Sequence, residues 1–134
     1  MGRQLHHDID FEIRFYEGIL EKRRDFLQAL IALGDLYTRK GQYEEGLVID
    51  ERLSRLRPED PVILYNLACS YSLTSRVDEA YETIKRAIAC GYDDFAHLCR
   101  DSDLTNLLAD KRFKHYLKKA ASSRQKASAA DQVP

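Results

Sequence analysis

The sequence predicts an all-α fold built from repeated helix pairs, and two observations carry that prediction. First, residues 27–60 and 61–94 follow one pattern position by position, which aligns Leu33 with Leu67 and Tyr37 with Tyr71. Second, the apolar residues within each unit recur three and four positions apart, the spacing that places them on one face of a helix. The other aligned pairs are Leu30 with Leu64, Gly34 with Ala68, Gly46 with Ala80, and Leu53 with Ala87.

A helix is expected before the two units, over about residues 9–23, with Asp8 or Asp10 as its N-cap. Residues 1–8 are polar and are predicted to be flexible. Phe11 and Phe15 fall away from the apolar face of this helix. Two explanations stay open: either the first eight residues fold over the two rings, or the rings form a contact surface for a second copy or a partner.

The first unit is predicted to contain one helix from about Leu27 to Lys40 and a second from about Tyr43 to Arg57. Gly41 suits the left-handed backbone of a helix C-terminus. In the second unit, Pro61 suits the first turn of a helix capped by Asp60. Its internal turn has Ser75 in place of Gly, so either Ser75 adopts an unfavourable conformation or the turn differs.

After Gly91 the periodicity breaks into short pieces that begin at aspartates, which are good N-caps. Asp93 or Asp94 is expected to open a helix to about residue 100, Asp101 or Asp103 another to about 108, and Asp110 a third to about 119. These pieces supply an apolar cover for the last repeat: Phe95, Leu98, Leu104, Leu107, Leu108, Phe113, Tyr116 and Leu117. Residues 120–134 are predicted to be a disordered tail.

A period of about 34 residues, with small residues at the helix crossings and Tyr one turn later, resembles the tetratricopeptide repeat. The resemblance covers residues 9–119 as one domain, with a preceding half repeat, full repeats at about 27–60 and 61–94, and a cap over 95–119. It implies a right-handed αα superhelix with short capping helices at the C-terminus. It also implies a concave groove lined by the first helix of each pair. The implied partner-binding residues are Gln28, Asp35, Arg39, Tyr65, Asn66, Cys69, Ser72 and Arg100.

Asn66 is the strongest candidate in this groove, because its amide can both donate to and accept from a peptide backbone. The alternative is that Asn66 serves only local helix structure. One subfamily of these repeats grips a C-terminal carboxylate with a clamp of Lys, Asn, Asn, Lys and Arg. Asn66 and Arg100 match two of those places, whereas Ile31, Asp35 and Ala96 stand at the other three. A negative Asp35 opposes an anionic ligand, so that specificity is not expected.

Composition sets the expected class of partner and location. The formal net charge is −1, so no overall field favours nucleic acid. No apolar stretch reaches the length of a membrane span, and the first residues lack the apolar run of a signal peptide. Three cysteines without a CxxC spacing are expected to be reduced. We therefore expect a cytoplasmic protein with neither nucleic acid nor membrane as a partner.

The sequence contains no pattern that indicates catalysis. Phosphate loops, HExxH and GxSxG are absent, and His97 and Cys99, two residues apart, face different directions on a helix. We expect no enzyme activity, cofactor or metal. The expected function is a non-catalytic protein–protein interaction module that binds a protein or peptide segment in its groove. The alternative is a homo-oligomeric scaffold, such as a homodimer, assembled through Phe11 and Phe15.

Overall fold

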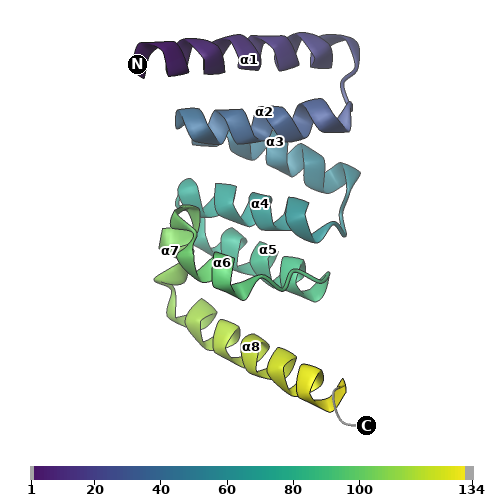
Figure 1. Ribbon diagram of the computed structural model, residues 1–134, viewed down its shortest axis with the longest axis vertical. Helices are drawn as coiled ribbons and strands as arrows, with labels where there is room; N and C mark the ends of the chain where they lie inside the picture. The colour runs from purple at the N-terminus through teal and green to yellow at the C-terminus, as the bar shows by residue number, and fades with distance from the viewer. Residues whose placement is uncertain (1, 132–134) are drawn as a thin grey trace.

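The structure of the protein, a computed structural model, describes residues 2–131 and the side chains of residues 8–123. Within that range the chain consists of helices and short connections and has no strand, which confirms the all-α prediction. The helices of residues 2–89 follow one another along one long axis, the short helices of residues 95–108 lie back beside the last of these, and the helix of residues 111–131 ends the array at the side opposite the first helix (Figure 1). The elements are α1 (Gly2–Lys22), α2 (Leu27–Lys40), α3 (Tyr43–Leu56), α4 (Pro61–Leu73), α5 (Val77–Ala89), α6 (Phe95–Arg100), η1 (Ser102–Leu104), α7 (Thr105–Leu108) and α8 (Lys111–Asp131).

Small residues allow the two helices of the first full repeat, α2 and α3, to approach closely. A Cβ atom on Gly34 would lie 2.9 Å from Oδ1 of Asp50, and one on Gly46 would lie 3.1 Å from Oγ1 of Thr38. Both distances are shorter than an ordinary van der Waals contact, so neither position can hold a larger residue without a shift of its neighbours. This explains why small residues recur at these places in the sequence pattern.

Successive pairs are joined by a hydrogen bond that repeats with the sequence. The Tyr37 hydroxyl in α2 donates to Glu17 in α1 at 2.9 Å, and the Tyr71 hydroxyl in α4 donates to Glu51 in α3 at 3.1 Å. The donor and the acceptor are 20 residues apart in both cases. Helix α1 therefore occupies the place of a second helix in a preceding repeat, which confirms the predicted half repeat.

The aspartates that the sequence marked as helix starts act as N-caps. Asp60 accepts from the backbone N–H groups of Val62 and Ile63 at 2.9 and 3.1 Å. Of the two open choices in the cap region, Asp94 accepts from His97 N–H at 3.0 Å, and Asp101 accepts from Asp103 N–H at 3.0 Å. These bonds satisfy donors that a helix start leaves without a partner in the helix.

The turn between α4 and α5 settles the question left open at Ser75. Ser75 has φ of 63°, in the left-handed region, whereas the corresponding turn after α2 places Gly41 at φ of 86°. A side chain costs free energy in that region and a glycine does not. The second repeat therefore keeps the geometry of the first turn with a less suitable residue.

Both ends of the chain are more helical than the sequence predicted. Helix α1 begins at Gly2 rather than near residue 9, so Asp8 and Asp10 lie inside it and are not N-caps. No proline interrupts residues 2–22, and nothing in the backbone therefore stops the helix there. At the other end, α8 continues to Asp131 through residues predicted to be disordered. The low hydrophobicity of that tail suggested disorder, but Ala, Lys, Gln and Arg are strong helix formers.

The interior consists of two apolar clusters that meet between α3 and α4. One cluster joins α1, α2 and α3 and includes Leu30 and Leu33. The other joins α4, α5 and the capping elements and includes Leu64 and Phe113. Phe113 is completely buried and meets the edge of Tyr81, with ring centroids 6.5 Å apart. The capping segment thus covers the last repeat as predicted, because an uncovered end would expose that apolar face.

Candidate partner-binding groove

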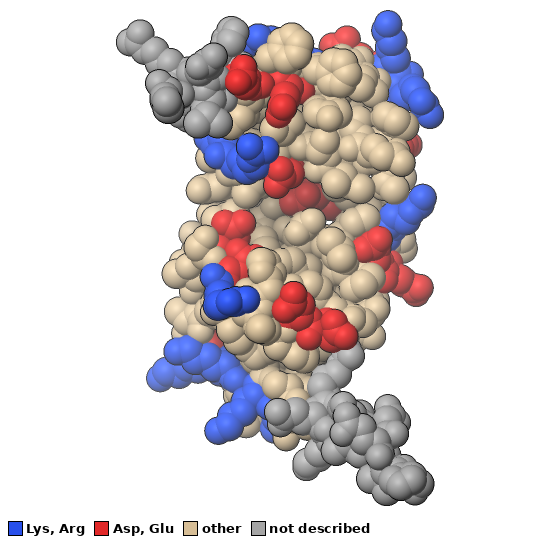
Figure 2. Space-filling view, viewed as in Figure 1, with Lys and Arg blue, Asp and Glu red and all other residues tan. Residues whose placement is uncertain are grey.

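A cavity of about 540 Å³ opens where the two apolar clusters meet, with α2 and α3 on one side and α4 and the α6–η1 segment on the other. Figure 2 shows the corresponding hollow across the middle of the molecule. The cavity is lined in part by two exposed apolar side chains, Ile31 of α2 and Val62 of α4, which are 46% and 58% exposed. Asn66 of α4 also lines it and is exposed. This cavity is called the groove below.

The polar lining of the groove is strongly acidic. Its carboxylates come from α2, α3, the start of α4 and the α6–η1 segment, and Figure 2 shows acidic surface beside the hollow. The imidazole of His97 also lines the groove and lies 3.3 Å from Asp101. Arg39 lies outside the lining and pairs with Asp35 at 3.6 Å, with both side chains more than half exposed. The lining carboxylates are Asp35, Asp50, Asp60, Asp101 and Asp103.

Asp50 is a buried carboxylate in this lining, with only 6% of its surface exposed. The Ser70 hydroxyl donates to its Oδ2 at 2.5 Å. Burial raises the pKa of Asp50 to about 6; the Ser70 hydrogen bond opposes that rise and the charge of Asp35 adds to it. Asp50 fits here because Gly34, directly opposite in α2, has no side chain.

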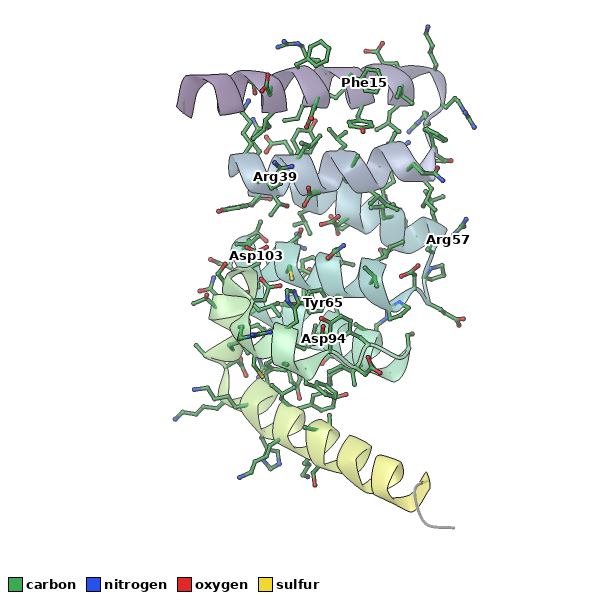
Figure 3. All side chains as sticks on the ribbon, viewed as in Figure 1. Phe15, Arg39, Arg57, Tyr65, Asp94 and Asp103 are labelled. Carbon is green, nitrogen blue, oxygen red and sulfur yellow. The ribbon has the colours of Figure 1, made fainter. Side chains whose placement is uncertain are left out.

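Tyr65 and Cys69 form a buried part of the lining on α4. The Tyr65 hydroxyl donates to Asp101 at 2.6 Å, and its ring stacks on Tyr92 with centroids 4.3 Å apart. Figure 3 shows Tyr65 between α4 and α6. Burial is the larger cause of the raised pKa of Tyr65, and the hydrogen bond to Asp101 raises it further. Burial also raises the pKa of the Cys69 thiol, with added effects of Asp101 and Asp103. Through its contacts with Tyr92 and Asp101, Tyr65 thus stabilises the packing of the capping segment against α4.

The structure brings together half of the residues that the sequence assigned to the groove: Asp35, Tyr65, Asn66 and Cys69 line it. Gln28 and Arg39 are exposed on α2 but do not line the cavity. Arg100 donates from Nε to the Ala96 carbonyl on its own helix and also lies outside the lining.

Ser72 is the clearest correction, because it is buried rather than open to a partner. Its hydroxyl accepts from Leu107 N–H at 3.3 Å, and its carbonyl accepts from the Asn106 amide at 2.8 Å. Both donors belong to α7, which packs over the end of α4. The resemblance placed Ser72 on the open face of the groove, whereas the short elements after α5 fold across that position.

The sequence reasoning missed several acidic members of the groove. Asp101 and Asp103 were predicted only as helix caps, and Asp50 was not predicted to be a groove residue. The alignment of the repeats does contain a signal for Asp50, because the equivalent positions hold Tyr16 and Ile84. Asp50 is therefore an acidic residue at a repeat position that otherwise holds a large, mainly apolar side chain.

Comparison with known proteins agrees with this architecture. Residues 29–61 match the family model described as tetratricopeptide repeat. The helical stack and the repeated hydrogen bonds define the class of the protein as an all-α helical-repeat array, and residues 29–61 of it are similar to a tetratricopeptide repeat. It is similar to a chloroplastic protein of Arabidopsis thaliana, at 34% identity over 85 residues. That match covers 61% of this chain and 25% of the relative, so the chain spans about a quarter of that protein.

Two other features bear on function: possible membrane spans and possible metal sites. None of the described helices has both the length and the hydropathy that a membrane span requires. Across the same part of the chain, no group of three or more His, Cys, Asp or Glu side chains is arranged to hold a metal ion. The name of the relative assigns that protein to the chloroplast. The cytoplasmic location expected for the present chain stays a prediction.

Proposed function

We propose that this chain is a protein-interaction module whose groove binds a segment of a partner protein. Tetratricopeptide arrays present extended concave surfaces, and their general role is to bind proteins. The observation that carries the proposal is the composition of the groove. Exposed Ile31 and Val62 from two different helices offer apolar contact, and Asn66 offers a donor and an acceptor beside them. Such a mixture of apolar contact and few polar groups suits recognition of a peptide.

The test is a selection of random displayed peptides on the immobilised chain, with a groove variant for comparison. The variant carries Ile31→Ser, Val62→Ser and Asn66→Ala, three changes at exposed positions that should alter stability by about 0.5 kcal/mol or less each. We expect peptides enriched on the natural chain to lose at least roughly tenfold in affinity for the variant. Isothermal titration of the enriched peptides measures that loss, and thermal melting checks that the variant is folded.

Peptides that bind both proteins equally would place the binding surface elsewhere and contradict the proposal. An absence of any enriched peptide would contradict it as well. Tyr65 is left unchanged in the variant because it is buried and holds Asp101. A change there would disturb the capping segment and mix stability with binding.

A second candidate function, self-association through α1, is favoured by one observation. Phe11 and Phe15 are 62% and 55% exposed, so the residues whose side chains are described do not cover them. Figure 3 shows Phe15 on α1, the helix at one end of the array. Two exposed aromatic rings on an end helix could pack against the same surface of a second copy about a two-fold axis.

If α1 forms a dimer, light scattering should give an apparent mass twice the 15.5 kDa of one chain. The double change Phe11→Ser with Phe15→Ser should then return the mass to that of one chain, because it removes the apolar contact. The control is Val48→Ser, which removes an exposed apolar side chain from α3. A natural chain that stays monomeric up to about 1 mM, the range of the weakest specific contacts, rules this candidate out.

A further inference from the structure

The groove contains a polar contact at a place where the rest of the array has apolar ones. Asp50 of α3 receives a hydrogen bond from Ser70 of α4, and the two residues are 20 positions apart. One repeat earlier the equivalent pair is Tyr16 with Leu36, and one repeat later it is Ile84 with Leu104. All four of those side chains belong to the two apolar clusters. The helix packing alone therefore does not require a carboxylate at position 50.

A carboxylate in this position is unfavourable unless something compensates it. Burial removes water from the charged group, and one hydroxyl donor returns only part of that hydration. Among the residues whose side chains are described, no Lys, Arg or His forms an ion pair with Asp50. The neighbouring ionisable group on α2 is Asp35, whose charge repels that of Asp50. The nearby thiol of Cys69 on α4 is buried and adds no positive charge.

The unfavourable charge extends along the groove. Burial raises the pKa of Asp103, and the charges of Asp101 and Asp35 raise it further. Figure 3 shows Asp103 near the end of α4, on the same side of the molecule as Arg39. Arg39 and His97, which pair with groove carboxylates, are both more than half exposed, so water screens their effect. The carboxylates come from α2, α3 and η1, a spread along the groove that suits several cationic groups of one ligand.

We propose that the groove is specific for a basic segment of a partner protein, with a Lys or Arg side chain inserted beside Asp50 and Asp35. Further cationic groups of that segment lie over Asp101 and Asp103. This inference deepens the proposed function and rests on it. The groove requires a ligand side chain with a long apolar stem and a positively charged head. The stem can pack against Ile31 and Val62 while the head reaches the buried carboxylate, the arrangement that Lys and Arg adopt in other amphipathic sites.

Another source of positive charge is a second copy of this chain. Helix α8 begins with exposed basic side chains, which Figure 2 shows as a blue region at one end of the molecule. Arg112 among them already pairs with Asp78 and Asp110. The charge of Arg112 is thus already balanced within its own chain, which makes α8 a poorer source of positive charge for the groove than a segment with free Lys or Arg side chains. We therefore assign the groove to a foreign segment and test the second copy separately.

The test begins with the peptides whose binding depends on the groove, as defined by the Ile31, Val62 and Asn66 variant. We expect their sequences to be enriched in Lys and Arg relative to the starting library and depleted in Asp and Glu. Groove-dependent peptides of neutral or acidic composition would overturn this inference and leave the proposed function intact. A failure to obtain any groove-dependent peptide would instead overturn the proposed function, so the two failures are distinguishable.

The second measurement is the affinity of one enriched basic peptide for charge variants of the chain. Asp50→Asn keeps the acceptor for Ser70 and removes the charge, and Asp35→Asn removes an exposed charge that the fold does not need. We expect each change to weaken binding by roughly tenfold, whereas Glu82→Gln, the same loss of charge on α5, should change it less than about twofold. If Asp50→Asn does not fold, Asp35→Asn still decides the result.

Equal affinities for the Asp35, Asp50 and Glu82 variants would overturn the assignment of these two carboxylates. Light scattering of the natural chain, without peptide, tests the competing occupant. Self-association that Asp35→Asn abolishes, and that the Phe11 and Phe15 changes leave unaltered, would assign the groove to α8 of a second copy. That result would overturn the proposal of a foreign segment.

Discussion

Replacement of Phe113 by Ala is expected to destabilise the protein by about 3 to 5 kcal/mol, because it leaves a cavity in a closely packed cluster. Phe113 is fully buried beneath α5, where its ring meets Tyr81. The loss is large compared with the total stability of a small domain, about 5 to 15 kcal/mol. Urea unfolding followed by circular dichroism measures it.

Phe15→Ala is the matched control, since it makes the same change at a ring that is 55% exposed. We expect that variant to lose no more than about 0.5 kcal/mol in the monomer, as exposed substitutions usually do. A loss below about 1 kcal/mol for Phe113→Ala would mean that the capping segment contributes little to the fold. The fully buried position of Phe113 would then not reflect its energetic role.

Asp50→Asn is expected to stabilise the protein at neutral pH. Burial raises the pKa of Asp50 from 3.8 to about 6, so ionisation of this carboxyl is less favourable in the folded chain than in the unfolded one. A shift of about two pH units corresponds to an upper limit of about 3 kcal/mol at pH 7. The Asn side chain removes this term and still accepts the hydrogen bond from Ser70.

The sign of the pH dependence follows from the direction of this shift. Between about pH 4 and pH 6 the folded chain holds a proton on Asp50 that the unfolded chain has released. The contribution of Asp50 to the free energy of unfolding therefore falls as the pH rises through this range and is constant above it. Asp35 on α2 adds to the shift, and Ser70 on α4 opposes it.

The measurement compares the natural chain with Asp50→Asn by urea unfolding at several pH values, with Glu82→Gln as the exposed control. The difference in stability should be near zero below pH 4 and should grow to its full value above pH 6. A difference that does not vary with pH would contradict the raised pKa of Asp50. If Asp50→Asn stabilises the fold and also weakens binding of basic peptides, the charge of Asp50 favours binding at a cost in stability.

Much of the fold follows from local sequence signals. The repeat period, the helix start at Asp60 and Pro61 and the strained turn at Ser75 are properties of short segments, and all three are found in the structure. Helix length at the two ends was underestimated. The low hydrophobicity of the residues after 119 indicated disorder, whereas the helix propensity of their Ala, Lys and Gln favours continuation of α8. Composition alone does not show which of these two tendencies is stronger.

The groove was predictable only in part. Asn66, Asp35 and Cys69 line it because a regular first helix points one face to the concave side. Ser72 follows the same periodicity, yet α7 packs on it and removes it from solvent. The repeat pattern predicts that Tyr65 contacts a partner, but its hydroxyl donates a hydrogen bond to Asp101, 36 residues away in the chain. The segment after α5 has no sequence period, so its contacts with α4 cannot be predicted from the repeat.

The sequence by itself determined the repeat, the all-α class and the half repeat at the start, because helix periodicity and the recurring small residues are local and repeat along the chain. Only the tertiary structure decided that five aspartates meet in one groove and that Asp50 is buried there. The physical reason is that burial and repulsion between charges depend on distances in space. Residues far apart in the chain, such as Asp35 and Asp103, become neighbours only after the capping segment folds back across α4.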